Sequence, residues 1–119
     1  MKETLSVSEL EIMRVLWRTG EPMSIQQVSD SLENSTWKYN TVATLLLRME
    51  QKSAVSSEKR GRSIYYRALL DKELYKKEQT SSLVEKLYDG SAMELAVSLF
   101  KSGDISKEDI EQIRKMFGL

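Results

Sequence analysis

The stretch from Thr36 to Arg67 constrains the fold of this chain most, because a helical repeat in it is followed directly by two segments of strand-like character. Its first apolar residues recur at the spacing of one helical face. These residues are Val42, Leu45, Leu46 and Met49. The spacing predicts a helix from about Tyr39 to Lys52, with one face in a core and the opposite face exposed.

The exposed side of this predicted helix carries small or hydrogen-bonding groups. They are Asn40, Ala43, Thr44, Leu47 and Gln51, with Thr41 and Arg48 on the flank. Side chains of these kinds can approach base edges and phosphates. The helical periodicity alone is equally compatible with an ordinary solvated face, so the segments that follow decide between the two interpretations.

Two short segments after the helix, Ala54 to Glu58 and Ser63 to Ala68, predict a β-hairpin. In the second segment a predicted half-buried face, Ile64, Tyr66 and Ala68, alternates with Tyr65 and Arg67. The tip is Lys59-Arg60-Gly61-Arg62, three cations around the one residue type that adopts positive φ without steric cost. A helix followed by such a hairpin has the order of a winged helix, in which the helix enters the major groove.

The charge distribution agrees with a local DNA-binding surface. The whole chain of 119 residues has a formal net charge of zero. Between Lys38 and Arg67, however, seven cations face two anions, a net charge of +5, and both flanking parts are acidic. The candidate DNA-binding residues are Lys38, Tyr39, Asn40, Thr41, Ala43, Thr44 and Arg48 from the helix, and Lys59, Arg60 and Arg62 from the hairpin.

Several classes of protein are disfavoured by what the chain lacks. It contains no Cys and no His, so thiolate chemistry, disulfides and the commonest general base and metal ligand are missing. We expect no metal, no cofactor and no enzymatic activity. No apolar run is long enough to span a membrane, and the N-terminus lacks a signal-peptide pattern, so a cytoplasmic protein without membrane insertion is expected.

Capping signals divide the rest of the chain into helices. Ser6 with Glu9, and Ser24 with Gln27, predict helices over about Val7 to Arg18 and up to about Leu32. A polar loop follows, Asn34, Ser35 and Thr36, and the next residue, Trp37, is expected to fill the core rather than to stack on a base. Beyond the hairpin, three further helices are predicted: about Lys72 to Tyr88 after Asp71, a helix opened by a capping box at Ser91 to Glu94, and Ser106 to Met116.

The expected fold class is therefore mainly α with a small β-hairpin, a winged helix-turn-helix domain over residues 1–70 and a helical dimerisation region over 71–119. Three short amphipathic helices have too little volume for an independent core, so a second copy of the chain is the simplest cover for their apolar faces. The expected dimerisation residues are Leu83, Leu87, Met93, Leu95, Ala96, Leu99, Phe100, Ile110 and Ile113. A two-fold protein also suits an inverted-repeat DNA operator.

An ordered set of motifs over nearly the whole chain resembles the penicillinase-repressor family (BlaI/MecI), which also includes the copper-responsive repressor CopY. The motifs are Ser8 to Met13 with Leu16-Trp17, then Trp37, then Asn40 to Met49, and then Gly61 to Tyr66. The most specific part is Thr41 to Arg48 followed by the Gly-Arg wing. The resemblance implies a dimeric winged-helix repressor of antibiotic-resistance or cell-envelope stress genes, released through a membrane-bound sensor by cleavage in its C-terminal helices.

The chain departs from the family pattern at four points. Lys38 stands where the family often has a Ser cap, and Ser53 where it often has Gly after the helix. The family's scissile Asn-Phe bond would fall at Leu99-Phe100, the candidate cleavage site, where Leu replaces Asn. The cysteine motif of the copper-responsive branch is absent.

The main alternative is a winged helix that binds another protein and no nucleic acid. A charged hairpin tip is by itself more often a solvated turn, and Tyr66 is expected to pack across the strands. Binding of random duplex at low salt distinguishes the two, because a DNA-binding protein retains sequence-independent affinity. An enzyme is the weakest interpretation, since no motif gathers the available Asp, Glu, Lys, Ser or Tyr into a cleft.

Overall fold

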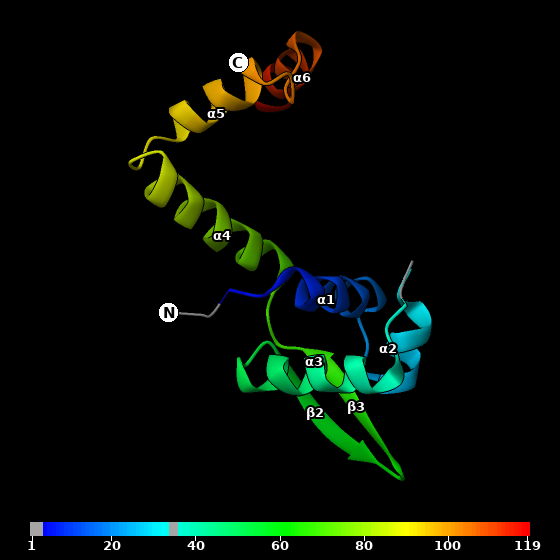
Figure 1. Cartoon of the computed structure of the whole chain (residues 1–119). Coiled ribbons are helices and arrows are strands. Elements are labelled where there is room, and N and C mark those ends of the chain that lie inside the picture. The colour runs from blue at the N-terminus through cyan, green and yellow to red at the C-terminus, as the bar shows by residue number, and fades with distance from the viewer. Residues whose placement is uncertain (1–3, 34–35) are drawn as a thin grey trace. The chain divides into compact units, whose positions relative to one another are not determined.

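The computed structural model describes residues 4–33 and 36–119. The described residues form helices and one small sheet (Figure 1). The elements are α1 (Val7–Thr19), β1 (Met23–Ser24), α2 (Ile25–Ser31), α3 (Tyr39–Gln51), β2 (Val55–Arg60), β3 (Ser63–Ala68), α4 (Lys72–Leu87), α5 (Ala92–Lys101) and α6 (Lys107–Phe117). The chain divides into two compact units, Met1–Lys76 and Lys77–Leu119. The predicted fold class, mainly α with a β-hairpin in a winged-helix arrangement, is confirmed.

The predicted caps of the first two helices are present. Ser6 Oγ accepts from the Glu9 amide at 3.1 Å, and Glu9 Oε1 accepts from the Ser6 amide at 2.8 Å. Ser24 and Gln27 make the same reciprocal pair. Gly20 ends α1 with φ of 75°, a conformation that favours glycine. Two of the three loop residues predicted after α2, Asn34 and Ser35, lie outside the described residues.

The core of the first unit lies where α1, α2 and α3 meet the sheet. All four apolar residues predicted for the inner face of α3 are buried, and Trp37 packs against the core from its edge, as expected. The other largest buried side chains come from the remaining elements: Ile12, Met13, Leu16, Val28 and Val55. Burial of these side chains on three helices and the sheet fixes the inner side of α3 and leaves its outer side exposed.

The sheet contains three antiparallel strands in the order β1-β3-β2. Strand β1 was not predicted, because two residues carry no periodicity. It forms only where Met23 pairs with Tyr66 and Ser24 with Tyr65. Ser24 thus belongs to the sheet and also caps α2, which ties the start of that helix to the hairpin.

The hairpin differs from the prediction in two ways. Strand β2 starts at Val55 and continues to Arg60, so Lys59 and Arg60 belong to the strand and the turn is Gly61 and Arg62. Ile64 is 43% exposed rather than half-buried. Figure 1 shows the physical reason: the hairpin extends past α3, so residues near its tip have no core to pack against.

Three helices follow the hairpin, as expected: α4 begins in the first unit, and α5 and α6 lie in the second. Asp71 Oδ2 accepts from the Leu74 amide at 2.9 Å and so caps α4. Ser106 and Asp109 form the complete capping box predicted for α6. The box predicted for α5 forms only in half: Ser91 Oγ accepts from the Glu94 amide, and among the described contacts Glu94 makes no reciprocal bond. Helices α5 and α6 contain no buried residue within the described protomer.

Candidate nucleic-acid interface

The outer face of α3 presents most of the residues predicted to contact DNA. Exposed side chains line it in the order Lys38, Tyr39, Asn40, Thr41, Thr44, Leu47 and Arg48. Ala43 is half-buried, so it offers only its methyl group at the edge of this face. The burial pattern brings these candidates together on one surface, as the helical spacing predicted.

Thr44 is already engaged by its own helix. Its hydroxyl donates to the backbone carbonyl of Asn40 at 2.9 Å. The hydroxyl proton is therefore committed, while an oxygen lone pair and the methyl group remain available on the exposed side. Such a group can accept a hydrogen bond from a base amino group or contact a thymine methyl, and it is poorly suited to donate to a base.

The N-terminus of α3 has no side-chain cap among the described contacts. Lys38 occupies the cap position with φ of −80° and ψ of 161°, and its side chain makes no capping bond. The first amides of a helix lack partners inside the helix, and the helix dipole places partial positive charge there. An uncapped, exposed N-terminus beside a Lys side chain is chemically suited to a phosphate oxygen.

The C-terminus of α3 is closed by the backbone. Ser53 adopts φ of 61°, its amide donates to Glu50 O at 3.0 Å, and the Ala54 amide donates to Met49 O at 2.9 Å. This pair of bonds is a Schellman motif, which normally places Gly at the left-handed position. Ser53 therefore performs with some backbone strain what glycine performs freely.

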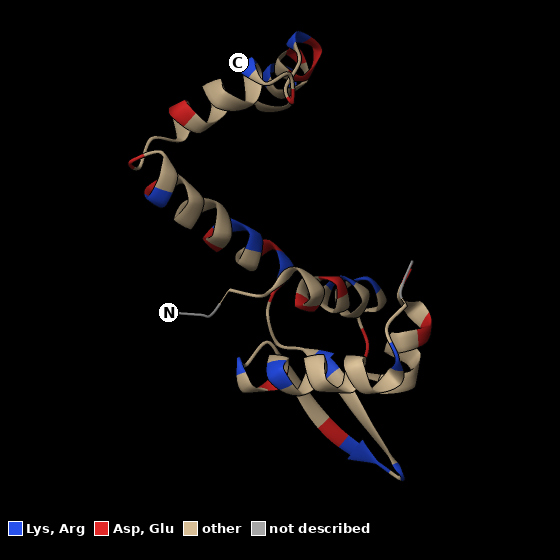
Figure 2. Ribbon diagram, viewed as in Figure 1, with Lys and Arg blue, Asp and Glu red and all other residues tan. Residues whose placement is uncertain are grey.

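The three cations near the tip of the wing, Lys59, Arg60 and Arg62, lie in different environments. Arg60 Nε donates to Glu58 Oε1, and its guanidinium lies 5.2 Å from the centre of the Tyr65 ring. Arg60 is thus paired within the hairpin. Lys59 and Arg62 are exposed, and Figure 2 shows the cations gathered at the end of the hairpin.

Strand register assigns these side chains to two faces. Glu58 lies opposite Tyr65 and Lys59 lies opposite Ile64, so Arg60 and Lys59 project from opposite faces. The Lys59 face also carries Ser57, whose hydroxyl donates to Glu50 on α3 at 2.5 Å. Lys59 and the exposed Ile64 therefore lie on the face of the wing that meets α3.

Sequence reasoning missed two features of this surface. It treated Arg60 as equivalent to its neighbours, although Glu58, two residues away in a strand, was a visible signal for a same-face partner. It also placed Ile64 on the half-buried face of the strand, because alternation does not reveal where along a hairpin the core ends.

Other kinds of site are not found in the part of the chain that the structure describes. No group of three or more acidic side chains is arranged to hold a metal ion in residues 4–33 and 36–119. Among the same residues, no helix is long and apolar enough to cross a membrane.

The fold and this surface define a winged-helix protein, with an exposed helix beside a hairpin that carries free cations. The family model described as penicillinase repressor matches residues 5–118, and the chain belongs to the penicillinase-repressor family. The resemblance seen in Thr41 to Arg48 and the Gly-Arg wing is thereby confirmed.

Individual relatives support the same assignment. The chain is 27% identical over 109 residues to the penicillinase repressor of Bacillus licheniformis, covering 92% of this chain and 85% of that protein. It is similar to the solution structure of the DNA-binding domain of the repressor BlaI, with 35% identity and a TM-score of 0.53 over 60% of this chain and 90% of that one. The Bacillus licheniformis BlaI monomeric form in complex with the blaP half-operator has 31% identity and a TM-score of 0.51, covering 61% and 89% of the two chains.

Proposed function

We propose that this chain represses transcription by binding an inverted-repeat DNA operator as a homodimer in the cytoplasm. Its family and fold make it a DNA-binding transcriptional repressor, and the alternative of a winged helix that binds only protein is not favoured. One observation carries the proposal: the outer face of α3 and the exposed wing cations Lys59 and Arg62 lie on the same domain, in a stretch from Lys38 to Arg67 whose net charge is +5.

The arrangement supports a division of labour on the DNA. Helix α3 enters the major groove, where Asn40 and Thr44 meet base edges and Arg48 meets a base or a phosphate. The α3 N-terminus, Lys59 and Arg62 meet the phosphate backbone, which sets the register without reading sequence. The contribution of Arg60 is smaller, because Glu58 already neutralises part of its charge.

Dimerisation through the second unit is supported by its uncovered apolar side chains. Most of the predicted residues are exposed in the protomer, including Leu87 at 70% and Met93 at 72%, while Leu95 and Leu99 are half-buried. Val97, Met116 and Phe117 are further exposed apolar residues of the same helices. A second copy of the chain carries the same apolar surface and can cover it, and homodimers are the commonest assemblies.

Binding to two linked half-sites would strengthen the affinity of the dimer for its operator. The monomeric form of Bacillus licheniformis BlaI forms a complex with a half-operator. If each protomer of the present chain reads one half-site, the second binding event becomes intramolecular and can strengthen binding on the order of 10²-fold or more. We further propose that cutting in the C-terminal helices, with Leu99-Phe100 as the candidate bond and a membrane sensor upstream, ends repression by separating the protomers.

The proposed function is tested by measuring DNA binding with random duplex and with duplex selected by the protein from a random pool. We expect measurable affinity for random duplex at low salt and a much higher affinity for the selected duplex. A protein that binds neither, while remaining folded, would contradict the proposal and favour the protein-binding alternative.

Two variants test the assignment of helix and wing. Arg62→Ala should weaken binding to every duplex about equally and lower the salt slope by roughly one unit. Asn40→Ala should instead relax base preference, at roughly 1–3 kcal/mol for a good contact. The reverse pattern would mean that the roles of helix and wing are exchanged.

A further inference from the structure

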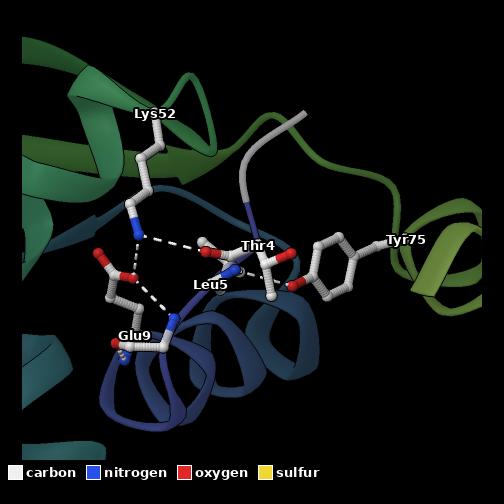
Figure 3. Close-up of polar contacts among 6 residues, drawn as sticks. Thr4, Leu5, Glu9, Lys52 and Tyr75 are labelled. Carbon is white, nitrogen blue, oxygen red and sulfur yellow. Dashed lines mark hydrogen bonds and ion pairs between the residues drawn. The ribbon is translucent and has the colours of Figure 1, made fainter. Parts of the chain in front are cut away.

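Lys52 is a cation at the end of the DNA-reading helix, but its side chain turns away from the exposed face. Its Nζ donates to Glu9 Oε1 at 2.7 Å and to the backbone carbonyl of Thr4 at 3.3 Å (Figure 3). The Lys52 side chain is 23% exposed and that of Glu9 is fully buried. Lys52 is therefore bonded to two other parts of the domain and is poorly placed to meet a phosphate.

The segment that Lys52 holds is itself fixed from the other side. The Leu5 amide donates to Tyr75 Oη at 3.0 Å in a buried bond, and Tyr75 lies in the first turn of α4 (Figure 3). We call residues 4–6 the N-terminal strap. Tyr75 is in turn packed against Trp17, with ring centres 6.1 Å apart. The strap thus connects the end of α3 to the start of α4 within the first unit.

Helix α3 is attached to the rest of the domain by polar bonds mainly at this end. Glu50 accepts from Ser57 of the wing, and Lys52 binds Glu9 and the strap, whereas the N-terminus has no side-chain cap among the described contacts. The apolar contacts of α3 are non-directional, so they constrain the exact rotation of the helix less than hydrogen bonds and ion pairs do. The directional bonds of Glu50 and Lys52 at the end of α3 add that constraint, and the rotation of the helix determines which side chains face which base.

Burial of the Glu9 carboxylate in the contact with Lys52 carries a desolvation cost. Its Oε2 is buried without a partner among the described residues, although a buried carboxylate oxygen normally has one. A capping role for α1 needs only Oε1 and would be served by an exposed Glu. The burial of the whole carboxylate against Lys52 therefore calls for a reason beyond capping.

We propose that Lys52, Glu9 and Tyr75 are positioning residues that set operator specificity through the N-terminal strap without touching DNA. This inference rests on the proposed DNA-binding function. In this proposal the Lys52–Glu9 ion pair fixes the orientation of α3. Tyr75, in the first turn of α4, contributes by holding the N-terminal strap in place.

The test uses the full-length protein and compares Lys52→Met with Lys59→Met, a matched loss of one Lys charge at the wing. Binding is measured against salt for random duplex and for a duplex selected by the wild-type protein. We expect Lys52→Met to lower the ratio of specific to random affinity on the order of tenfold with an unchanged salt slope. Lys59→Met should lower the slope by about 0.9 and leave the ratio unchanged.

Tyr75→Phe provides a second test that removes only one hydroxyl. It should lower the same ratio in the same direction, and the double variant with Lys52→Met should lose less than the sum of the single losses, because both act on one strap. Circular dichroism at the assay temperature checks folding, and Tyr75→Phe carries the test if Lys52→Met unfolds.

Two results would overturn the inference. A salt slope that falls by one for Lys52→Met would make Lys52 a direct phosphate contact. An unchanged affinity ratio in folded Lys52→Met or Tyr75→Phe would make the network purely structural. A wild-type protein that fails to prefer any duplex would instead contradict the proposed function itself.

Discussion

At the scale of single residues, Ser53 shows how one backbone angle limits stability. Its φ of 61° is a left-handed conformation that costs a residue with a Cβ about 1–2 kcal/mol. The two bonds of the Schellman motif after α3 hold Ser53 in this conformation. Ser53 is thus a site where a less common residue performs a glycine's role.

We predict that Ser53→Gly raises the free energy of unfolding by roughly 0.5–1 kcal/mol, since relief of strain exceeds the extra backbone entropy of Gly in the unfolded chain. Urea denaturation measures it. Ser56→Gly in β2 is the matched control and should destabilise, because Gly weakens a strand interior. A loss of stability in Ser53→Gly would show that no strain was present.

The buried Glu9 predicts a pH dependence. Burial raises the pKa of this carboxyl, but the Lys52 ammonium and the amide and hydroxyl of Ser6 together outweigh it and hold the pKa below its usual value of 4.5. A carboxyl with a lowered folded pKa contributes stability above its unfolded pKa, and this contribution is lost as pH falls through the folded pKa.

We therefore expect the free energy of unfolding of the wild type to fall as pH decreases below about 4.5, and Glu9→Gln to flatten this part of the profile. At neutral pH the variant should be less stable by roughly 1–3 kcal/mol, because Lys52 loses its charged partner. Glu58→Gln on the exposed wing is the control for the loss of one carboxylate, and its profile is compared with that of Glu9→Gln. If the free energy of unfolding fell equally at low pH in the wild type and in Glu9→Gln, Glu9 would not be the cause of the pH dependence.

At the scale of elements, the end of α5 decides how accessible the candidate cleavage bond is. The Leu99 carbonyl accepts from the Asp104 amide at 3.0 Å, the Ile105 amide at 3.2 Å and the Ser102 hydroxyl at 3.0 Å. Leu99-Phe100 therefore lies inside a closed helical turn. A protease needs extended backbone, so the last turn of α5 must unwind before this bond can be cut.

We predict that Gly103→Ala speeds limited proteolysis near Leu99-Phe100. Gly103 has φ of 86° and open space around its Cβ position, so Ala adds backbone strain of about 1–2 kcal/mol without a clash. Mass spectrometry of timed digests locates the cuts. Gly118→Ala, which strains the end of α6 in the same way, is the control and should not change cutting in α5. Equal rates in the two variants would mean that the turn does not gate the bond.

At the scale of the whole molecule, the two units differ in how they are stabilised. The first unit contains the buried core, and α5 and α6 of the second contain no buried residue within the described protomer. The second unit is thus the part expected to depend on a partner copy, so that stability and operator affinity both depend on protein concentration.

We predict that the wild-type protein sediments as the proposed dimer at micromolar concentration and that Ile113→Asp sediments as a monomer. Ile113 is 45% exposed in the protomer, so the charge opposes association rather than folding of the chain. Operator affinity should fall on the order of 10²-fold, with a smaller change for random duplex. Gln112→Asp on the same helix is the control. A wild-type protein that sediments as a monomer, or a variant that remains a dimer, would contradict the proposal that Ile113 lies in a dimer interface.

The sequence by itself determined the helices and most of their caps, because capping side chains and helical spacing act within a few residues. It also determined the buried face of α3 and the order of helix and wing, and hence the fold class. What it could not determine depends on pairing between distant residues. Strand β1 exists only through Tyr65 and Tyr66, and the exposure of Ile64 depends on how far the hairpin extends past α3.

The tertiary structure decided how the cations are used, although Glu58, two residues from Arg60, is a signal that the sequence already contains. Arg60, Lys59 and Lys52 carry the same charge in the sequence, yet one pairs with Glu58, one is exposed beside α3, and one is held by the buried Glu9. Strand register separates the first two, and packing of α1 against α3 places Glu9 within 2.7 Å of Lys52, 43 residues away. Charge is a property of the residue, but its partner is set by the fold.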